Sequence, residues 1–296
     1  MTNTQAMVTL VVGESYSAIW QQLCEPNWRR YAEKYHLDLI CLSQPLDTSK
    51  RAQERSAAWQ KCLILSQDFA QRYEQVVWMD ADIMINNRTA PNVIEGVPVE
   101  KVGAAQEITL SHTEPKTARE LLDRIGEFWP HLRPMVRYTA REYYTVYGLP
   151  DECDQVINTG VMVLSPRHHQ ALLEKVYYTY EEKRGREWHQ EMRPLSYELN
   201  HAGLVHCIDS RFNLMWFPQQ LLYYPFLLQP QIGSALPSRV KRKLRKLTGL
   251  DPLRTLQIAC INAAFQRSYF FHLGGLHMEE MSMIHQRAGS WREFCV

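Results

Sequence analysis

The chain has 296 residues, enough for one large domain or two modest ones. Its composition is 45% hydrophobic and 11% aromatic, which excludes the collagen-like, disordered and coiled-coil classes. Lys and Arg number 33 against 32 Asp and Glu, a net charge of +1. A chain so close to neutral is not expected to have nucleic acid as its main partner.

The seven cysteines are odd in number and none stands in a C-x-x-C pair, so we expect free thiols in a reducing compartment. The N-terminal apolar run is short and no basic leader precedes it, unlike a signal peptide. No apolar stretch approaches the ~20 residues that a membrane-spanning helix needs. Together these features predict a cytoplasmic protein.

Apolar, β-branched runs alternate along the chain with segments in which apolar residues recur at helical spacing. Strands are predicted at residues 7–12, 37–42, 75–85, 97–106, 156–164 and 205–208. Helices are predicted at residues 15–36, 55–73, 166–182 and 188–202, with a mainly helical stretch at 114–148 and an irregular aromatic one at 211–217. The alternation predicts an α/β domain with a mostly parallel central sheet flanked by helices.

Residues 229–256 interrupt this pattern with three prolines, two glycines and a basic run. We therefore divide the chain into a core at 1–228, a basic surface segment at 229–256, and the C-terminal part of the same domain at 257–296. Residues 239–246 hold six Lys or Arg and no acid. Apolar residues recur at helical spacing over 239–250, so this stretch is either a basic amphipathic helix on an anionic membrane surface or a solvated loop.

The strongest chemical signal is the pair Asp80 and Asp82, separated by Ala81, inside the apolar segment 75–85. On a regular strand the two carboxylates would share a face, an unfavourable like-charge pair unless a positive group compensates. At a strand exit such a pair can hold a hard divalent cation, Mn²⁺ or Mg²⁺, through its oxygens. The alternative is a solvated Asx turn at the end of the strand.

Three motifs follow one another along the chain: the D-x-D at residues 80–82, an N-T-G-V strand from Asn158, and F-H-L-G-G at 271–275. In this order they resemble the nucleotide-diphosphosugar glycosyltransferases of GT-A fold, especially the retaining glycogenin-like and galactosyl- and xylosyltransferase-like groups. The resemblance extends from Val8 to about Leu276. It implies a single Rossmann-like GT-A domain and transfer, with retention, from a nucleotide diphosphosugar to a glycan or lipid-linked acceptor hydroxyl. It favours a UDP-sugar over a GDP-sugar, with Mn²⁺ or Mg²⁺ as cofactor.

The resemblance also implies a metal site and a diphosphate site. Asp80 would contact the metal and the donor, Asp82 would ligate the metal, and His272 would complete the site. By its residues alone, His272 could equally be a core histidine. Further donor-binding positions would be Ala81, Gly274, Gly275 and His277. Relatives often carry a lysine after the glycines, but Met278 stands there in this chain.

Other positions acquire roles through the same resemblance. Val12 and Gly13 would pack against the nucleotide base, and Lys61 would face the donor. Asn158 would contact the transferred sugar beside Gly160, and Glu191 would lie near the reacting carbon. By the residues alone, Val12 and Gly13 could form an ordinary strand exit, and Lys61 could be a solvated helix lysine. Asn158 could be a structural amide, and Glu191 a surface glutamate in the first turn of a helix.

Two competing functions remain open at this point. A haloacid-dehalogenase-like phosphatase also carries D-x-D at a strand end, although near its N-terminus. The other is a relative that binds a sugar nucleotide or a glycan without turnover. Met192 and Met278 support this alternative, because they stand where the family favours Gln and Lys. For a transferase with a lipid-linked acceptor, residues 239–250 would place the enzyme peripherally at the inner membrane face. The oligomeric state is not predicted.

Overall fold

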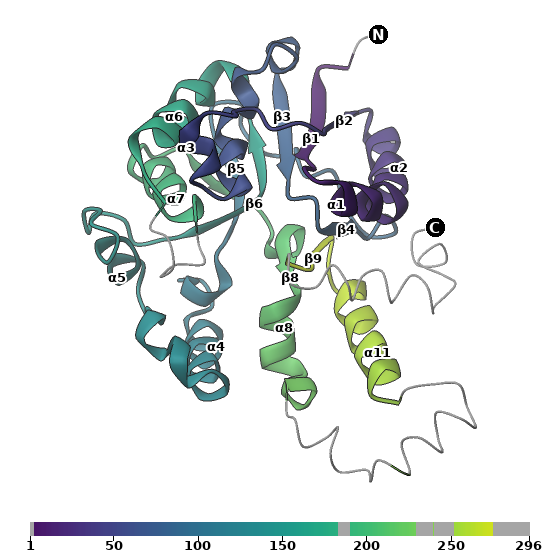
Figure 1. Ribbon diagram of the computed structural model, residues 1–296, viewed down its shortest axis with the longest axis vertical. Coiled ribbons are helices and arrows are strands. Elements are labelled where there is room, and N and C mark those ends of the chain that lie inside the picture. The colour runs from purple at the N-terminus through teal and green to yellow at the C-terminus, as the bar shows by residue number, and fades with distance from the viewer. Residues whose placement is uncertain (1–2, 183–189, 229–238, 240–251, 275–296) are drawn as a thin grey trace.

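The computed structural model describes residues 3–182, 190–228, 239 and 252–274. Its centre is a six-stranded sheet with strand order β2-β1-β3-β6-β5-β7 (Figure 1). The strands are β1 Gln5–Leu10, β2 Asp38–Leu42, β3 Gln75–Met79, β5 Val102–Gln106, β6 Ile157–Leu164 and β7 Val205–Cys207. All run parallel except β6, which is antiparallel to both β3 and β5. The predicted α/β class with a mostly parallel sheet is confirmed.

Helices cover both faces of this sheet, which explains why its central strands are apolar without alternation. In β3, Val77 and Met79 pack on one side with residues of α2 (Glu25–Tyr35) and α11 (Pro252–Gln266). Val76 and Trp78 pack on the other side with residues of α6 (Pro166–Thr179), α7 (Met192–His201) and a 3₁₀-helix at Ala57–Ser66. Both faces of the central strands are therefore buried.

The prediction of one continuous strand at residues 75–85 is wrong. β3 ends at Met79, a turn follows, and β4 (Ile83–Ile85) joins a second, three-stranded sheet of order β4-β9-β8. In that sheet β4 is antiparallel to β9 (Phe270–His272), which is parallel to β8 (Leu214–Met215). Helix α2 helps to hold β4 there, because Trp28 Nε1 donates to the carbonyl of Ile83 at 2.8 Å.

The remaining helical segments follow the predicted periodicity but are divided. Residues 15–36 form α1 (Glu14–Ile19), a π-helical turn at Trp20–Cys24, and α2. Residues 114–148 form α4 (Pro115–Phe128), a 3₁₀-helix at Pro130–Met135, and α5 (Ala140–Thr145). The stretch expected to be irregular holds a 3₁₀-helix at Ser210–Asn213, then β8 and α8 (Trp216–Tyr223). Shorter helices are α3 (Lys50–Gln53) and 3₁₀-helices at Ala70–Arg72, Ile108–Leu110 and Pro225–Leu228.

Some predicted features fall at or beyond the limits of the described chain. Within the basic segment 229–256, the structure describes Arg239 and the start of α11 at Pro252, so the membrane prediction for 239–250 remains a prediction. Gly275 and His277 also lie outside the described residues. The six cysteines of the described part are free thiols. Among the described helices, none combines the length and apolarity needed to cross a bilayer.

Candidate active site

The candidate site forms at one edge of the sheet because β6 runs antiparallel to its neighbours. Because β6 is antiparallel to β3, its first residues lie beside the carboxyl end of β3. The backbone N–H of Asp80 donates to the carbonyl of Gly160 at 2.8 Å, which joins the D-x-D turn to the N-T-G segment. Two motifs that are far apart in the sequence therefore share one edge of the sheet, where α/β folds commonly bind ligands.

Lys61 is the positive group that the carboxylates require. Its side chain is 2% exposed, and Nζ lies 3.0 Å from Asp80 Oδ1 and 2.8 Å from Glu191 Oε1. It also donates to the carbonyl of Thr159 at 3.4 Å. Burial alone would lower the pKa of Lys61, but the two carboxylates outweigh it and the net shift is upward. Lys61 is thus a buried, charged residue of the site and not a solvated helix lysine.

Glu191 lies in the same buried network and not at the surface. It is 3% exposed, directly precedes α7, and accepts a hydrogen bond from Thr159 Oγ1 at 3.1 Å. Asp80 is held from a second side, because Trp78 Nε1 donates to its Oδ1 at 2.9 Å. Two carboxylates and one ammonium therefore form a fixed cluster with a net negative charge.

Asp82 and His272 form a second buried pair. Asp82 Oδ1 lies 3.1 Å from His272 Nε2, and both side chains are 7% exposed. The register of the second sheet brings them together, since Ile83 pairs with His272 and the N–H of Leu273 donates to the carbonyl of Asp82. Burial would raise the pKa of Asp82, but the facing imidazolium lowers it overall. Conversely, burial would lower the pKa of His272, but Asp82 raises it.

The donor atoms of this pair fit a divalent cation. Adjacent ligands around Mg²⁺ lie roughly 3 Å apart, and Asp82 Oδ1 and His272 Nε2 have this spacing. Carboxylate oxygens with one imidazole nitrogen also suit Mn²⁺. Asp80 is turned toward Lys61 and Trp78, and no cluster of three His, Cys, Asp or Glu side chains in the described part of the chain is arranged to hold an ion. The fit therefore rests on Asp82 and His272, with Asp80 two residues away.

Asn158 connects two residues that sequence reasoning missed, Glu107 and Asn213. Asn158 Nδ2 donates to Glu107 Oε2 at 2.8 Å, and its Oδ1 accepts from Asn213 Nδ2 at 2.7 Å and from the N–H of Gly160 at 2.9 Å. Asn213 Oδ1 in turn lies 2.8 Å from His272 Nδ1. The available sequence signals were weak: Glu107 follows a predicted strand, and Asn213 is a polar residue in an aromatic stretch.

Position 160 must be a glycine because the ring of His272 packs against it. A Cβ on Gly160 would lie 2.7 Å from Cε1 of the imidazole, closer than real Cβ contacts allow. The imidazole therefore occupies the space that a side chain at position 160 would fill. We expected this glycine to permit close approach of the sugar, and the structure shows that it permits close approach of the histidine.

The other predicted positions surround these pairs. Val12 and Gly13 follow the end of β1, and Gly274 follows β9; both glycines have positive φ and open space where a Cβ would be. Ala81 is buried within the D-x-D turn. Sequence reasoning missed Tyr16 of α1, whose pKa is raised by burial and by the negative charges of Asp82 and Asp80.

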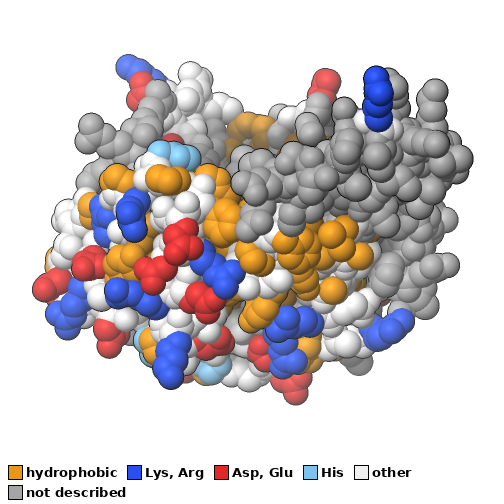
Figure 2. Space-filling view, turned by 90° about the horizontal axis from the view of Figure 1, so that it is seen from below, with side chains coloured by type: hydrophobic (Ala, Val, Ile, Leu, Met, Phe, Trp, Pro, Cys, Tyr) orange, Lys and Arg blue, Asp and Glu red, His pale blue; other side chains and the backbone are white. Residues whose placement is uncertain are grey.

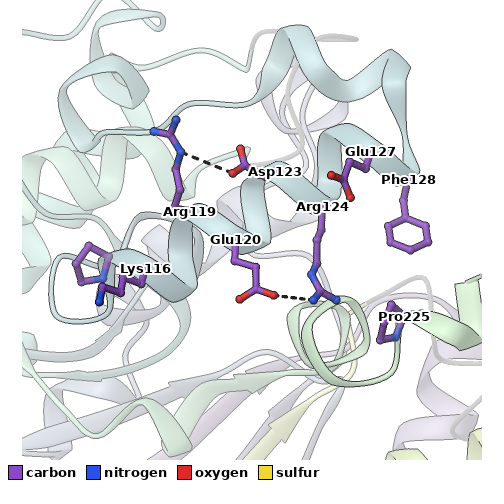
Figure 3. A pocket seen from close by; sticks show the side chains of 9 residues that line it. Lys116, Arg119, Glu120, Asp123, Arg124, Glu127, Phe128 and Pro225 are labelled. Carbon is purple, nitrogen blue, oxygen red and sulfur yellow. Dashed lines mark hydrogen bonds and ion pairs between the residues drawn. The ribbon is translucent and has the colours of Figure 1, made fainter.

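A separate groove of about 890 Å³ lies along α4 and is not lined by any residue of the site (Figure 3). Its charges are paired along the helix, with Arg124 2.6 Å from Glu120 and Arg119 3.7 Å from Asp123. Figure 2 shows this end of the molecule from below, with acidic and basic side chains around apolar ones. The groove has no convergent set of charges of one sign.

The architecture belongs to the GT-A class: a mostly parallel sheet flanked by helices, with the D-x-D turn at a strand exit. One similar solved structure is a glycosyltransferase involved in the glycosylation of the major capsid of PBCV-1, with 13% identity, a TM-score of 0.50 and coverage of 94% of this chain and 99% of that one. Another is the WbbM bifunctional glycosyltransferase, with 9% identity and a TM-score of 0.50. This match covers 98% of this chain and 52% of that chain. No family model and no curated protein sequence matches the chain. At these identities the likeness establishes the fold.

Proposed function

We propose that the protein is a metal-dependent glycosyltransferase that moves a sugar from a nucleotide diphosphosugar to an acceptor hydroxyl. One observation carries the proposal: the D-x-D turn ends a central strand of a GT-A-type sheet and meets both a buried lysine and a buried histidine. The spacing of Asp82 and His272 supports Mn²⁺ or Mg²⁺ as cofactor. The donor class, with a UDP-sugar favoured over a GDP-sugar, follows from the motif resemblance.

The reaction needs negative charge to be stabilised on the departing diphosphate. A divalent cation held by Asp82 and His272, with Asp80 beside them, would supply that stabilisation when bound. The protein's own contribution is to hold these ligands in place. Lys61 offsets the charge of Asp80, and the packing of His272 against Gly160 limits the movement of the ring. Such preorganisation avoids reorganisation of the site during the reaction.

Glu191 suits an electrostatic role better than that of a general base. Its Oε1 already accepts from Thr159 and pairs with Lys61, so two partners hold the carboxylate in place. A fixed negative charge stabilises a sugar carbon that gains positive character as the diphosphate leaves. Retention, in which the acceptor attacks from the face that the diphosphate leaves, does not require a strong base. We therefore propose retention, with Asn158 contacting the transferred sugar.

The acceptor is proposed to be a hydroxyl of a glycan or of a lipid-linked glycan. The basic stretch at 239–250 supports peripheral contact with an anionic membrane surface. Flotation of the protein with anionic and neutral vesicles, compared with a variant neutralised at Lys and Arg of 239–246, tests that contact. Equal flotation of both proteins would contradict it.

The enzymatic assignment is tested by turnover of a panel of UDP- and GDP-sugars with Mn²⁺, for the wild type and Asp82→Ala. Turnover that requires the metal and is lost in Asp82→Ala supports the proposal. Asp123→Ala, at an exposed carboxylate of α4 paired with Arg119, is the matched control and should retain turnover. Binding without turnover would indicate a catalytically impaired binding relative, and phosphate release from monoesters would indicate the phosphatase.

A further inference from the structure

A chain of four buried polar side chains leads from Glu107 through Asn158 and Asn213 to His272. The successive donor–acceptor distances are 2.8, 2.7 and 2.8 Å, and the four residues are 4, 8, 8 and 6% exposed. Such a chain is shielded from water, so each amide can satisfy its hydrogen bonds only in one orientation.

The direction of these hydrogen bonds follows from the two groups whose role is unambiguous. The backbone N–H of Gly160 can only donate, so the atom of Asn158 that it meets at 2.9 Å is the carbonyl oxygen. The amide nitrogen of Asn158 then faces the carboxylate of Glu107, a good acceptor. Asn158 Oδ1 also accepts a hydrogen bond from Asn213, so the donor of that bond is the amide nitrogen of Asn213.

The orientation of Asn213 in turn determines the tautomer of the histidine. Its remaining atom, Oδ1, faces His272 Nδ1 at 2.8 Å and can only accept, so Nδ1 carries a hydrogen. Nε2, which lies 3.1 Å from Asp82 Oδ1, also carries a hydrogen in the imidazolium; in the neutral Nδ1–H ring its lone pair is free to bind a cation. Metal-binding histidines typically have their second nitrogen fixed by an outer hydrogen bond of this kind.

We propose that Asn213 is a positioning residue that holds His272 in the Nδ1–H tautomer, with Nε2 available to a cation shared with Asp82. The inference rests on the proposed metal site. The backbone supports it independently of the amide network, because Asn213 directly precedes β8, whose Met215 pairs in register with His272 of β9. Asn213 is therefore anchored to the strand that carries the histidine.

The first test reads the tautomer directly, without metal or substrate. Long-range ¹H–¹⁵N spectra of protein labelled at histidine, recorded at alkaline pH, report which ring nitrogen carries the hydrogen; His272→Gln assigns the signal. Because the Asp82 carboxylate would otherwise hold the hydrogen on Nε2, both proteins also carry Asp82→Ala; we expect Nδ1–H when Asn213 is present and a mixture of tautomers in Asn213→Ala. Nε2–H in the Asp82→Ala protein that keeps Asn213, or an unchanged spectrum in Asn213→Ala, would overturn the proposal.

The second test measures Mn²⁺ affinity by electron paramagnetic resonance. Loss of an outer hydrogen bond to a ligand typically weakens metal binding about 10- to 100-fold, which we expect for Asn213→Ala. Gln75→Ala removes a comparably buried amide, which donates to the carbonyl of Val97 at the opposite end of β3 from the D-x-D turn, and controls for general loosening; its affinity should stay near that of the wild type. Wild-type affinity in Asn213→Ala, or no Mn²⁺ binding by the wild type, would overturn the inference. Mn²⁺ binding with the expected tautomer but no sugar-nucleotide turnover would contradict only the proposed function.

Discussion

Asp82 Oδ1 and His272 Nε2 lie 3.1 Å apart in the core, although the two residues are far apart in the sequence. Their meeting depends on β4 leaving the main sheet and pairing with β9. The proposed metal site therefore lies where the chain passes from the first sheet to the second. Substitutions of the residues that pack around it should perturb it.

Gly160→Ala is expected to displace His272, because the new Cβ would lie 2.7 Å from Cε1 of the ring. The affinity for Mn²⁺ should fall by about 10-fold or more, as for other changes that misplace a metal ligand. The matched control is Gly126→Ala, where the added Cβ meets Arg133 at an ordinary 3.6 Å. Titration of both variants with Mn²⁺ measures the effect, and unchanged affinity in Gly160→Ala would contradict the packing argument.

Lys61→Met is expected to destabilise the fold strongly. Removing the ammonium leaves the buried Glu191 carboxylate without its cation, which typically costs about 3–5 kcal/mol, and removes a partner of the partly exposed Asp80. The double variant Lys61→Met/Glu191→Gln should recover part of that loss, because one uncompensated charge disappears. Denaturant unfolding measures the free energies, with Lys50→Met on exposed α3 as control. A Lys61→Met protein as stable as the control would show that Lys61 does not offset the carboxylates.

Glu191→Gln keeps the shape of the side chain but removes its charge. If Glu191 stabilises a cationic sugar carbon, kcat should fall by about 100-fold while KM changes little. Glu198→Gln, at another buried carboxylate of α7 that pairs with Lys175, should leave kcat near the wild-type value. Steady-state kinetics with the active donor separate the two parameters. Equal kcat for Glu191→Gln and wild type would remove Glu191 from the mechanism.

His169, far from this site, is expected to make stability depend on pH. It is fully buried, accepts the N–H of Ser165 at Nδ1, and has a pKa lowered by burial. In the unfolded chain the histidine has its ordinary pKa of 6.5, so the stabilisation is complete above that pH and is lost as the pH falls toward the lower folded-state pKa.

His169→Gln removes this titration but keeps an acceptor for Ser165. The loss of unfolding free energy between about pH 8 and about pH 5 should therefore be smaller in His169→Gln than in the wild type. The control His168→Gln, at the neighbouring exposed histidine, should lose as much unfolding free energy as the wild type. Denaturant midpoints at the two pH values give the comparison. A wild-type-like loss in His169→Gln would exclude His169 as the source.

The sequence predicted the fold class and the residues that carry short motifs, because local features define both. The apolar, β-branched runs identified the strands, and the D-x-D and F-H-L-G-G motifs identified Asp82 and His272. The division of 75–85 between two sheets could not be predicted, since an apolar run has the same composition in either sheet. Glu107 and Asn213 were missed because their roles arise from tertiary contacts with Asn158 and His272.

Anomalous diffraction at the manganese edge, from crystals grown with Mn²⁺ and UDP, tests the central claim most directly. The account predicts one manganese peak within coordination distance of both the Asp82 carboxylate and His272 Nε2, adjacent to the UDP phosphates. UDP bound without manganese between these side chains, or manganese bound at another place, would contradict it.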